Sequence, residues 1–120
     1  HLQHSPYEED KIIRCITGKI FDVMLDVRLG SATYGKWHSV ILDAQKMNMV
    51  YIPKGFAHGF QTLEPNCEIL YLHTQFHAPK AEGGYRYDSP ELKIGWPLEI
   101  TEVSERDKNL EVFPKCRSPK

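Results

Sequence analysis

Short segments of strand length recur along this chain, and turn residues separate each from the next. The clearest lies at 20–28, where apolar side chains at odd positions alternate with a mostly polar set at even positions. A period of two is typical of a strand that has one buried face and one different face. Further segments lie at 11–17, 37–42, 47–52, 60–63 and 67–74. Short strands at such regular spacing predict an all-β sandwich or barrel.

The last third of the chain has a different character. Residues 76–97 are rich in Pro, Gly and Tyr, which predicts an ordered but irregular arm on the surface. Only 104–110 has a helical pattern, with Ser104 as a candidate N-cap and Asp107 three residues later. A chain of 120 residues has the length of one domain. We therefore expect residues 1–120 to form a single domain with one short C-terminal helix.

Charge and cysteine usage exclude several classes of function. Lys and Arg number 15 and Asp and Glu 16, a net charge of −1, whereas a nucleic-acid binder needs clustered positive charge. No apolar run approaches the roughly 18 residues of a membrane span. Cys15, Cys67 and Cys116 are widely spaced and form no CxxC pair, which argues against a disulfide framework or a structural zinc site. We expect Cys15 and Cys67 to be core thiols and the compartment to be the reducing cytoplasm.

A tight turn at Pro53–Gly55 leads into a strand that carries His58. This P-x-G-x-x-H pattern resembles the second motif of cupin barrels, in which the histidine faces the barrel interior. Metal-binding cupins add an H-x-H pair, and no such spacing occurs in this sequence. A divalent ion needs three or four convergent ligands, so we predict no metal and no cofactor. His73 and His77 lie where strand passes into loop, so we expect them to be separate, individually satisfied side chains rather than a pair.

Several longer motifs follow one another in a fixed order. They are H-x-Q at 1–3 with Pro6 and Lys11, GKIFDV at 18–23, DVR at 26–28, TYGKW at 33–37, IPKGFAHGF at 52–60, EILY at 68–71, DSP at 88–90, IGWP at 94–97 and S-x-x-D at 104–107. Together they resemble the dTDP-4-dehydrorhamnose 3,5-epimerase family over nearly the whole chain. The resemblance implies a jelly-roll cupin, usually a homodimer, that acts on nucleotide-activated 4-keto-6-deoxy sugars.

The resemblance also implies the catalytic residues. His1 falls on the catalytic base, and Asp107 falls on the carboxylate that pairs with it. Tyr71 falls on the phenol proposed as general acid. Lys11 falls on a cation beside the C4 oxygen of the sugar.

The remaining candidates are implied to bind substrate together with Lys11. Gln3 belongs to the motif of the base itself, and His58 falls on a further polar group of the site. His77 stands where many members carry an aromatic contact to the sugar or the thymine. This departure leaves the identity of the substrate open.

The chemistry of epimerisation next to a ketone requires these residue types. A base must remove a carbon-bound proton, and histidine titrates near neutral pH, with a carboxylate partner to raise its basicity. A cation or donor must hold the enolate oxygen, which contributes on the order of 3–4 kcal/mol. An acid must return a proton from the opposite face, and tyrosine, with a pKa near 10, stays protonated to do so.

One departure from the family concerns length, because its members extend further at the N-terminus. We therefore expect this chain to be the C-terminal part of a longer epimerase, whose missing segment supplies strands, part of the dimer and an arginine for the diphosphate. Relatives epimerise C3, C5 or both with nearly the same residues. Two alternatives stay open: a sugar-binding cupin without turnover, and a ketoisomerase that moves the carbonyl from C4 to C3.

Overall fold

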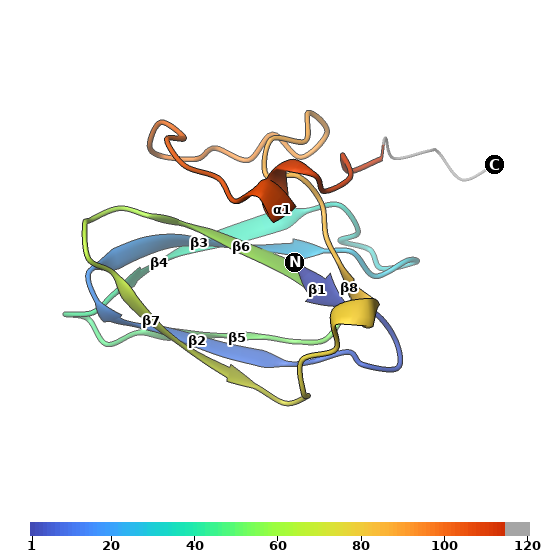
Figure 1. Cartoon of the computed structure of the whole chain (residues 1–120), viewed down its shortest axis with the longest axis horizontal. Helices are drawn as coiled ribbons and strands as arrows, with labels where there is room; N and C mark the ends of the chain where they lie inside the picture. The colour runs from blue at the N-terminus through green and yellow to red at the C-terminus, as the bar shows by residue number, and fades with distance from the viewer. Residues whose placement is uncertain (115–120) are drawn as a thin grey trace.

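Two three-stranded antiparallel sheets face each other in the computed structural model, which describes residues 1–114 (Figure 1). One sheet has the order β5-β2-β7, with β5 at Met49–Ile52, β2 at Lys11–Thr17 and β7 at Glu68–His73. The other has the order β4-β3-β6, with β4 at Trp37–Asp43, β3 at Lys19–Asp26 and β6 at Phe56–Thr62. The short strands β1 (Leu2–Gln3) and β8 (Glu82–Gly83) pair with each other, and the helical turns are η1 (Pro79–Ala81) and α1 (Glu105–Lys108).

The predicted all-β architecture is confirmed, but some predicted strand bounds were wrong. The strand expected at 60–63 begins at Phe56, directly after Gly55. Gly55 has φ +84°, and a side chain there would collide with Arg28, so the turn ends at this glycine and the extended backbone starts at once. The strand expected from 47 starts at Met49, because Met47 itself adopts a positive φ of 54° in the turn.

β3 alternates as predicted, yet both of its faces are covered. Its even positions, such as Ile20 and Met24, face the space between the sheets and pack in the core there. Its odd positions, such as Leu25, pack against Leu92 and Phe113 of the C-terminal arm. The even face also contains the fully buried Asp22. A polar residue on this strand therefore points into the protein and not into solvent.

The space between the sheets is apolar at one end. Ile13, Cys15, Ile20, Leu42 and Ile52 are all buried there and form one cluster. Burial of each large aliphatic side chain stabilises the fold by roughly 1.5–3 kcal/mol. The interior positions beyond this cluster are polar, because β2 begins with the buried Lys11 and β6 contributes the buried His58. The fold thus places Lys11 and His58 beyond this apolar cluster.

The C-terminal arm covers the outer face of the β4-β3-β6 sheet (Figure 1). The indole of Trp37 donates to Leu92 O at 2.7 Å, and Trp96 meets Phe21 edge to face at 5.7 Å between ring centroids. The arm is mostly irregular, as predicted, and includes α1. Ser104 is the N-cap of α1, accepting a hydrogen bond from Asp107 N at 3.1 Å, which confirms the predicted cap.

The outer face of the β5-β2-β7 sheet is apolar and exposed. Tyr51 and Leu72 flank Ile12 in adjacent strands, and Met49 and Leu70 flank Arg14 in the same way. The large apolar side chains on these edge strands are about half exposed (45–58%). An apolar face of this kind is typical of a surface that another protein segment covers.

Within residues 1–114, no helix is long and apolar enough to span a membrane. Cys15 is a buried free thiol, as predicted, and Cys67 is a free thiol packed against the core. Cys116 and the tail predicted at 116–120 lie outside the described residues.

Candidate active site

His1 and Asp107 form an imidazole–carboxylate pair. His1 Nε2 lies 2.5 Å from Asp107 Oδ1, although 106 positions separate the two residues. The backbone of His1 is aligned with β6, since His58 N donates to His1 O at 3.0 Å. Asp107 is held in turn by the Ser104 cap of α1. The pair has the geometry in which a carboxylate fixes the tautomer of a histidine base.

The second ring nitrogen of His1 is also occupied. Arg106 Nη2 lies 3.0 Å from His1 Nδ1. A guanidinium can only donate, so Nδ1 accepts and the proton of the neutral ring lies on Nε2, facing Asp107. The Arg106 guanidinium also contacts Glu82 Oε2 at 3.2 Å. Because the Arg106 side chain is 58% exposed, it has room to swing aside and free the Nδ1 lone pair.

Lys11 is a buried ammonium at the start of β2. Its Nζ donates to His1 O at 3.4 Å and lies 3.8 Å from Glu9 Oε1. Burial lowers the pKa of Lys11 below its ordinary value of 10.5, while the negative charges of Glu9, Asp22 and Glu82 raise it again. A buried cation of this kind is poised to meet an oxygen on which negative charge develops.

His58 forms a second buried imidazole–carboxylate pair, with Asp22. His58 Nε2 lies 2.5 Å from Asp22 Oδ1, and both side chains are buried. The register of the sheet explains the contact, because His58 stands opposite Met24 and Phe60 opposite Asp22 on the same face of β3 and β6. The predicted inward orientation of His58 is therefore present in the structure.

Tyr71 projects from β7 toward the same interior. Its ring meets His58 edge to face at 5.9 Å and stacks on His73 at 5.8 Å with 9° between the planes. Burial, and secondarily the charge of Asp22, raises the pKa of Tyr71 well above its ordinary value of 10. The phenol therefore keeps its proton at neutral pH and is available to donate it.

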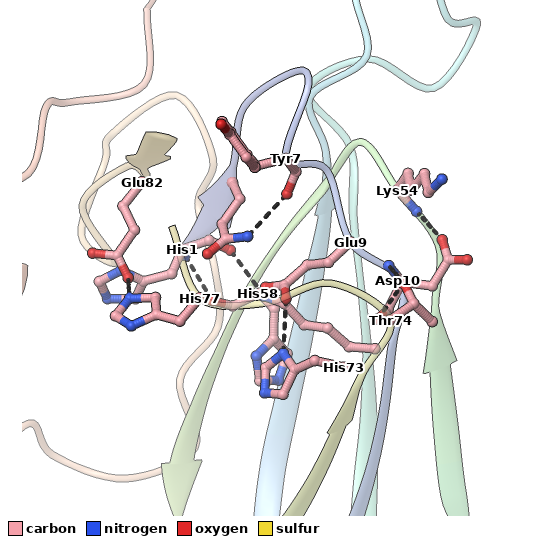
Figure 2. A network of polar contacts seen from close by, with 12 residues as sticks. His1, Tyr7, Glu9, Asp10, Lys54, His58, His73, Thr74, His77 and Glu82 are labelled. Atoms are coloured by element: carbon pink, nitrogen blue, oxygen red, sulfur yellow. Dashed lines mark hydrogen bonds and ion pairs between the residues drawn. The ribbon is translucent and has the colours of Figure 1, made fainter. Parts of the chain in front are cut away.

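Gln3 and His77 sit at the edge of the site. Gln3 is buried, and its amide donates to Tyr7 O at 2.9 Å and accepts from Ala78 N at 2.8 Å. Gln3 thus ties β1 to the segment around His77, and its predicted role as a substrate ligand stays a prediction. His77 Nε2 lies 2.5 Å from Glu82 Oε1 (Figure 2). His77 is separate from His73, which pairs with a different carboxylate.

All the predicted site residues line one pocket of about 870 Å³. They are His1, Gln3, Lys11, His58, Tyr71, His77 and Asp107. Among residues 1–114, no group of three His, Cys, Asp or Glu side chains is arranged to hold a metal ion. The pocket brings together the imidazole of His1, directly before β1, the ammonium of Lys11 on β2 and the phenol of Tyr71 on β7.

The amino-acid sequence of the chain matches a known family. A family model described as dTDP-4-dehydrorhamnose 3,5-epimerase matches residues 1–115. The chain belongs to this family. The epimerase of Shigella flexneri is 37% identical over 113 residues, which cover 94% of this chain and 62% of that protein. The epimerase of Pseudomonas aeruginosa is 42% identical over 106 residues, which cover 88% of this chain and 59% of that protein.

Solved structures of epimerases in the family have the same fold. The Bacillus anthracis dTDP-4-dehydrorhamnose 3,5-epimerase, with TDP and pyrophosphate bound, superposes with a TM-score of 0.91 at 33% identity, covering 93% of this chain and 64% of that one. The Legionella pneumophila dTDP-6-deoxy-D-glucose-3,5-epimerase, in complex with dTDP-4-keto-L-rhamnose, gives 0.88 at 37% identity, covering 92% and 59%. The predicted cupin fold is thereby confirmed. The chain spans about three fifths of the length of these relatives.

Sequence reasoning missed the partners of the predicted residues in this epimerase-family chain. Asp22 holds His58, Arg106 contacts His1, and Glu82 joins His77 to Arg106. Glu9 lies beside Lys11. Alternation did contain a signal for Asp22, because it shares a face of β3 with apolar Ile20 and Met24. No comparable local signal exists for Glu9, in the loop before β2, or for Glu82, in the two-residue strand β8.

Proposed function

We propose that the protein carrying this chain epimerises C3, C5 or both of a dTDP-4-keto-6-deoxyhexose or a related nucleotide sugar. The observation that supports this most strongly is the meeting of the His1–Asp107 pair, Lys11 and Tyr71 in one pocket. Pure binding needs no base and acid together. The alternative of a sugar-binding cupin without turnover is therefore less favoured.

The proposed reaction is a proton exchange next to the C4 ketone. His1, freed from Arg106, removes the proton from the adjacent carbon, and the electron pair of that bond moves onto the carbonyl oxygen. The Lys11 ammonium stabilises the resulting enolate. Tyr71 then donates its proton to the carbon from the other face, the carbonyl reforms, and the configuration is inverted. The tyrosinate and the imidazolium return to their starting states by exchange with solvent.

Incubation with dTDP-4-keto-6-deoxyglucose in D₂O tests this proposal. We expect proton NMR to show loss of the signals at C3, C5 or both, because each deprotonated carbon takes up solvent deuterium. Binding without exchange at either carbon would replace this proposal with the non-catalytic cupin. A product whose carbonyl has moved from C4 to C3 would identify a ketoisomerase.

We also propose that the protein is a homodimer in which a second copy covers the outer face of the β5-β2-β7 sheet. The exposed apolar side chains of this face support the proposal.

The cytoplasmic setting inferred from the cysteines, the single-domain organisation and the absence of a cofactor all stay predictions.

Leu72→Glu is expected to dissociate this dimer, because it would place a charge among apolar side chains on β7. Analytical ultracentrifugation of the parent protein and the variant measures the change in oligomeric state. Ile41→Glu is the matched control: Ile41 is similarly exposed but lies on β4 of the other sheet, so this variant should remain dimeric. A monomeric parent protein would refute the dimer. A dimeric Leu72→Glu variant would show that the dimer interface lies on a different surface.

A further inference from the structure

The pocket contains a fourth imidazole–carboxylate pair, which the proposed reaction does not use. Glu9 Oε2 lies 2.9 Å from His73 Nδ1, and Figure 2 shows the two side chains meeting below the loop that precedes β2. The Glu9 side chain is only 9% exposed, whereas His73 is 40% exposed. A carboxylate buried to this extent is costly unless it has partners. Its position beside the proposed reaction centre therefore calls for a physical explanation.

The other oxygen of Glu9 faces Lys11. Glu9 Oε1 lies 3.8 Å from Lys11 Nζ, and both side chains are more than nine-tenths buried. Lys11 and His73 are direct partners in the pairing of β2 with β7, so their side chains share one face of the sheet. Glu9 thus bridges two neighbouring strands from above, with one oxygen directed to each.

Asp10, directly after Glu9, is hydrogen-bonded to two other segments of the chain. Asp10 N donates to Thr74 Oγ1 at 2.9 Å, and Thr74 N donates to Asp10 O at 3.1 Å. Asp10 Oδ1 accepts from Lys54 N at 2.8 Å. These bonds anchor the loop to β7 and to the turn before β6, as Figure 2 shows. Glu9 is therefore positioned by the fold and does not depend on substrate to be placed.

We propose that Glu9 is a positioning residue that keeps the Lys11 ammonium in the pocket, and that His73 orients the Glu9 carboxylate for this task. The proposal rests on the proposed function, in which Lys11 stabilises the enolate. It assigns to Glu9 no contact with substrate. His73 acts one step further away, by donating to the Glu9 oxygen that Lys11 does not face.

The charges around Lys11 explain why Glu9 matters most. Burial disfavours the ammonium, and Glu9 is the leading group that opposes this effect, ahead of Asp22 and Glu82. Asp22 already pairs with His58, and Glu82 with His77 and Arg106. The titratable and charged groups that line the pocket with Lys11, or that act on its charge, are His1 before β1, Glu82 on β8, Glu9, Asp22 on β3, His58 on β6, Tyr71 and His73 on β7, His77, Arg106 and Asp107.

Glu9→Gln is the decisive variant, because it keeps the shape of the side chain and removes its charge. Without that charge, burial dominates and the pKa of Lys11 falls. We expect the alkaline limb of kcat/KM for deuterium exchange to move to lower pH by about one unit or more. Activity well below that limb should stay near that of the parent protein. A purely structural role would instead lower activity equally at every pH.

A second readout follows Lys11 without any activity. In ¹³C-lysine-labelled protein, the Lys11 signal is assigned by its absence from Lys11→Met, and its titration should shift in the same direction in Glu9→Gln. Glu9→Asp, which retains the charge, should restore most of the parental titration. Glu8→Gln makes the same change of charge one residue away and is expected to leave it unchanged.

Two His73 variants test the orienting role. His73→Asn retains a donor toward Glu9 and should titrate like the parent, whereas His73→Leu should shift Lys11 in the same direction as Glu9→Gln, by less. An unchanged Lys11 titration in Glu9→Gln would overturn the proposal. A higher pKa of Lys11 in His73→Leu than in the parent protein would refute the orienting role, because it would show that His73 competes with Lys11 for Glu9. If the parent protein exchanges no deuterium, the proposed function fails, but the Lys11 titration still decides the role of Glu9.

Discussion

Replacing Asp107 with Asn is expected to lower the rate of deuterium incorporation next to the C4 ketone by about 10²- to 10⁴-fold. Asn preserves the shape of the side chain and leaves the Ser104 cap intact, because that bond comes from the backbone N of Asp107. It removes the negative charge 2.5 Å from His1 Nε2 that stabilises the imidazolium formed during proton removal. His1→Asn is expected to show a loss of similar size, since the two residues act as one unit.

Glu105→Gln provides the control for this loss. Glu105 lies on α1 beside Arg106, and its side chain is 85% exposed and paired with Lys108. The substitution makes the same change of charge on the same helix without touching the pocket. Initial rates at saturating dTDP-4-keto-6-deoxyglucose, read by proton NMR in D₂O, compare the parent protein with Asp107→Asn, His1→Asn and Glu105→Gln. An Asp107→Asn variant as fast as Glu105→Gln would remove His1–Asp107 from the reaction.

The strands could be predicted from the sequence because their signal is local. Alternation and turn residues located every main strand, and Ser104 with Asp107 located the helix cap. The bounds failed where one residue decides them: a positive φ at Met47 delays β5, and the turn at Gly55 starts β6 early. The two-residue strands β1 and β8 carry no periodicity, because their pairing depends on segments about 80 residues apart in the chain.

The site could be predicted only in part, and for a different reason. His1, Lys11, Tyr71 and Asp107 were identified through family motifs, not through any local pattern that places them together. Their neighbours were missed because a carboxylate on a loop gives no sign of which cation it will meet. Glu9 illustrates this, as its contact with Lys11 spans two residues but depends on how the loop is tied to Thr74. Asp22 shows a second difficulty. A polar residue that alternates with apolar residues along a strand can face the interior of the sandwich instead of solvent.

The largest effect on stability is expected at Asp26, at the end of β3. Asp26 is 1% exposed, and its carboxylate accepts two hydrogen bonds from the Arg28 guanidinium, at 3.0 and 2.9 Å, and others from Ser31 and Thr33. These bonds, led by those from Arg28, hold the pKa of Asp26 well below its ordinary value of 3.8 in spite of burial. The carboxylate thus organises the loop between β3 and β4, which returns to Asp26 through Gly35 N and Lys36 O.

Asp26→Ala is expected to lower the free energy of unfolding by about 3 kcal/mol, the cost of breaking a buried pair when the remaining cation can still reach water. Because the folded pKa is depressed, the stabilisation by Asp26 is fully present above the unfolded pKa near 3.9 and is lost as pH falls through the folded pKa. Urea unfolding from pH 7 down to pH 3 should therefore show a smaller loss of unfolding free energy in the variant than in the parent protein.

Asp88→Ala is the matched control, because Asp88 makes the same two bonds to Arg86 at 2.8 and 2.9 Å but is 46% exposed. An exposed pair contributes about 0–1 kcal/mol, so equal losses in the two variants would mean that burial does not set the strength of the Asp26–Arg28 pair.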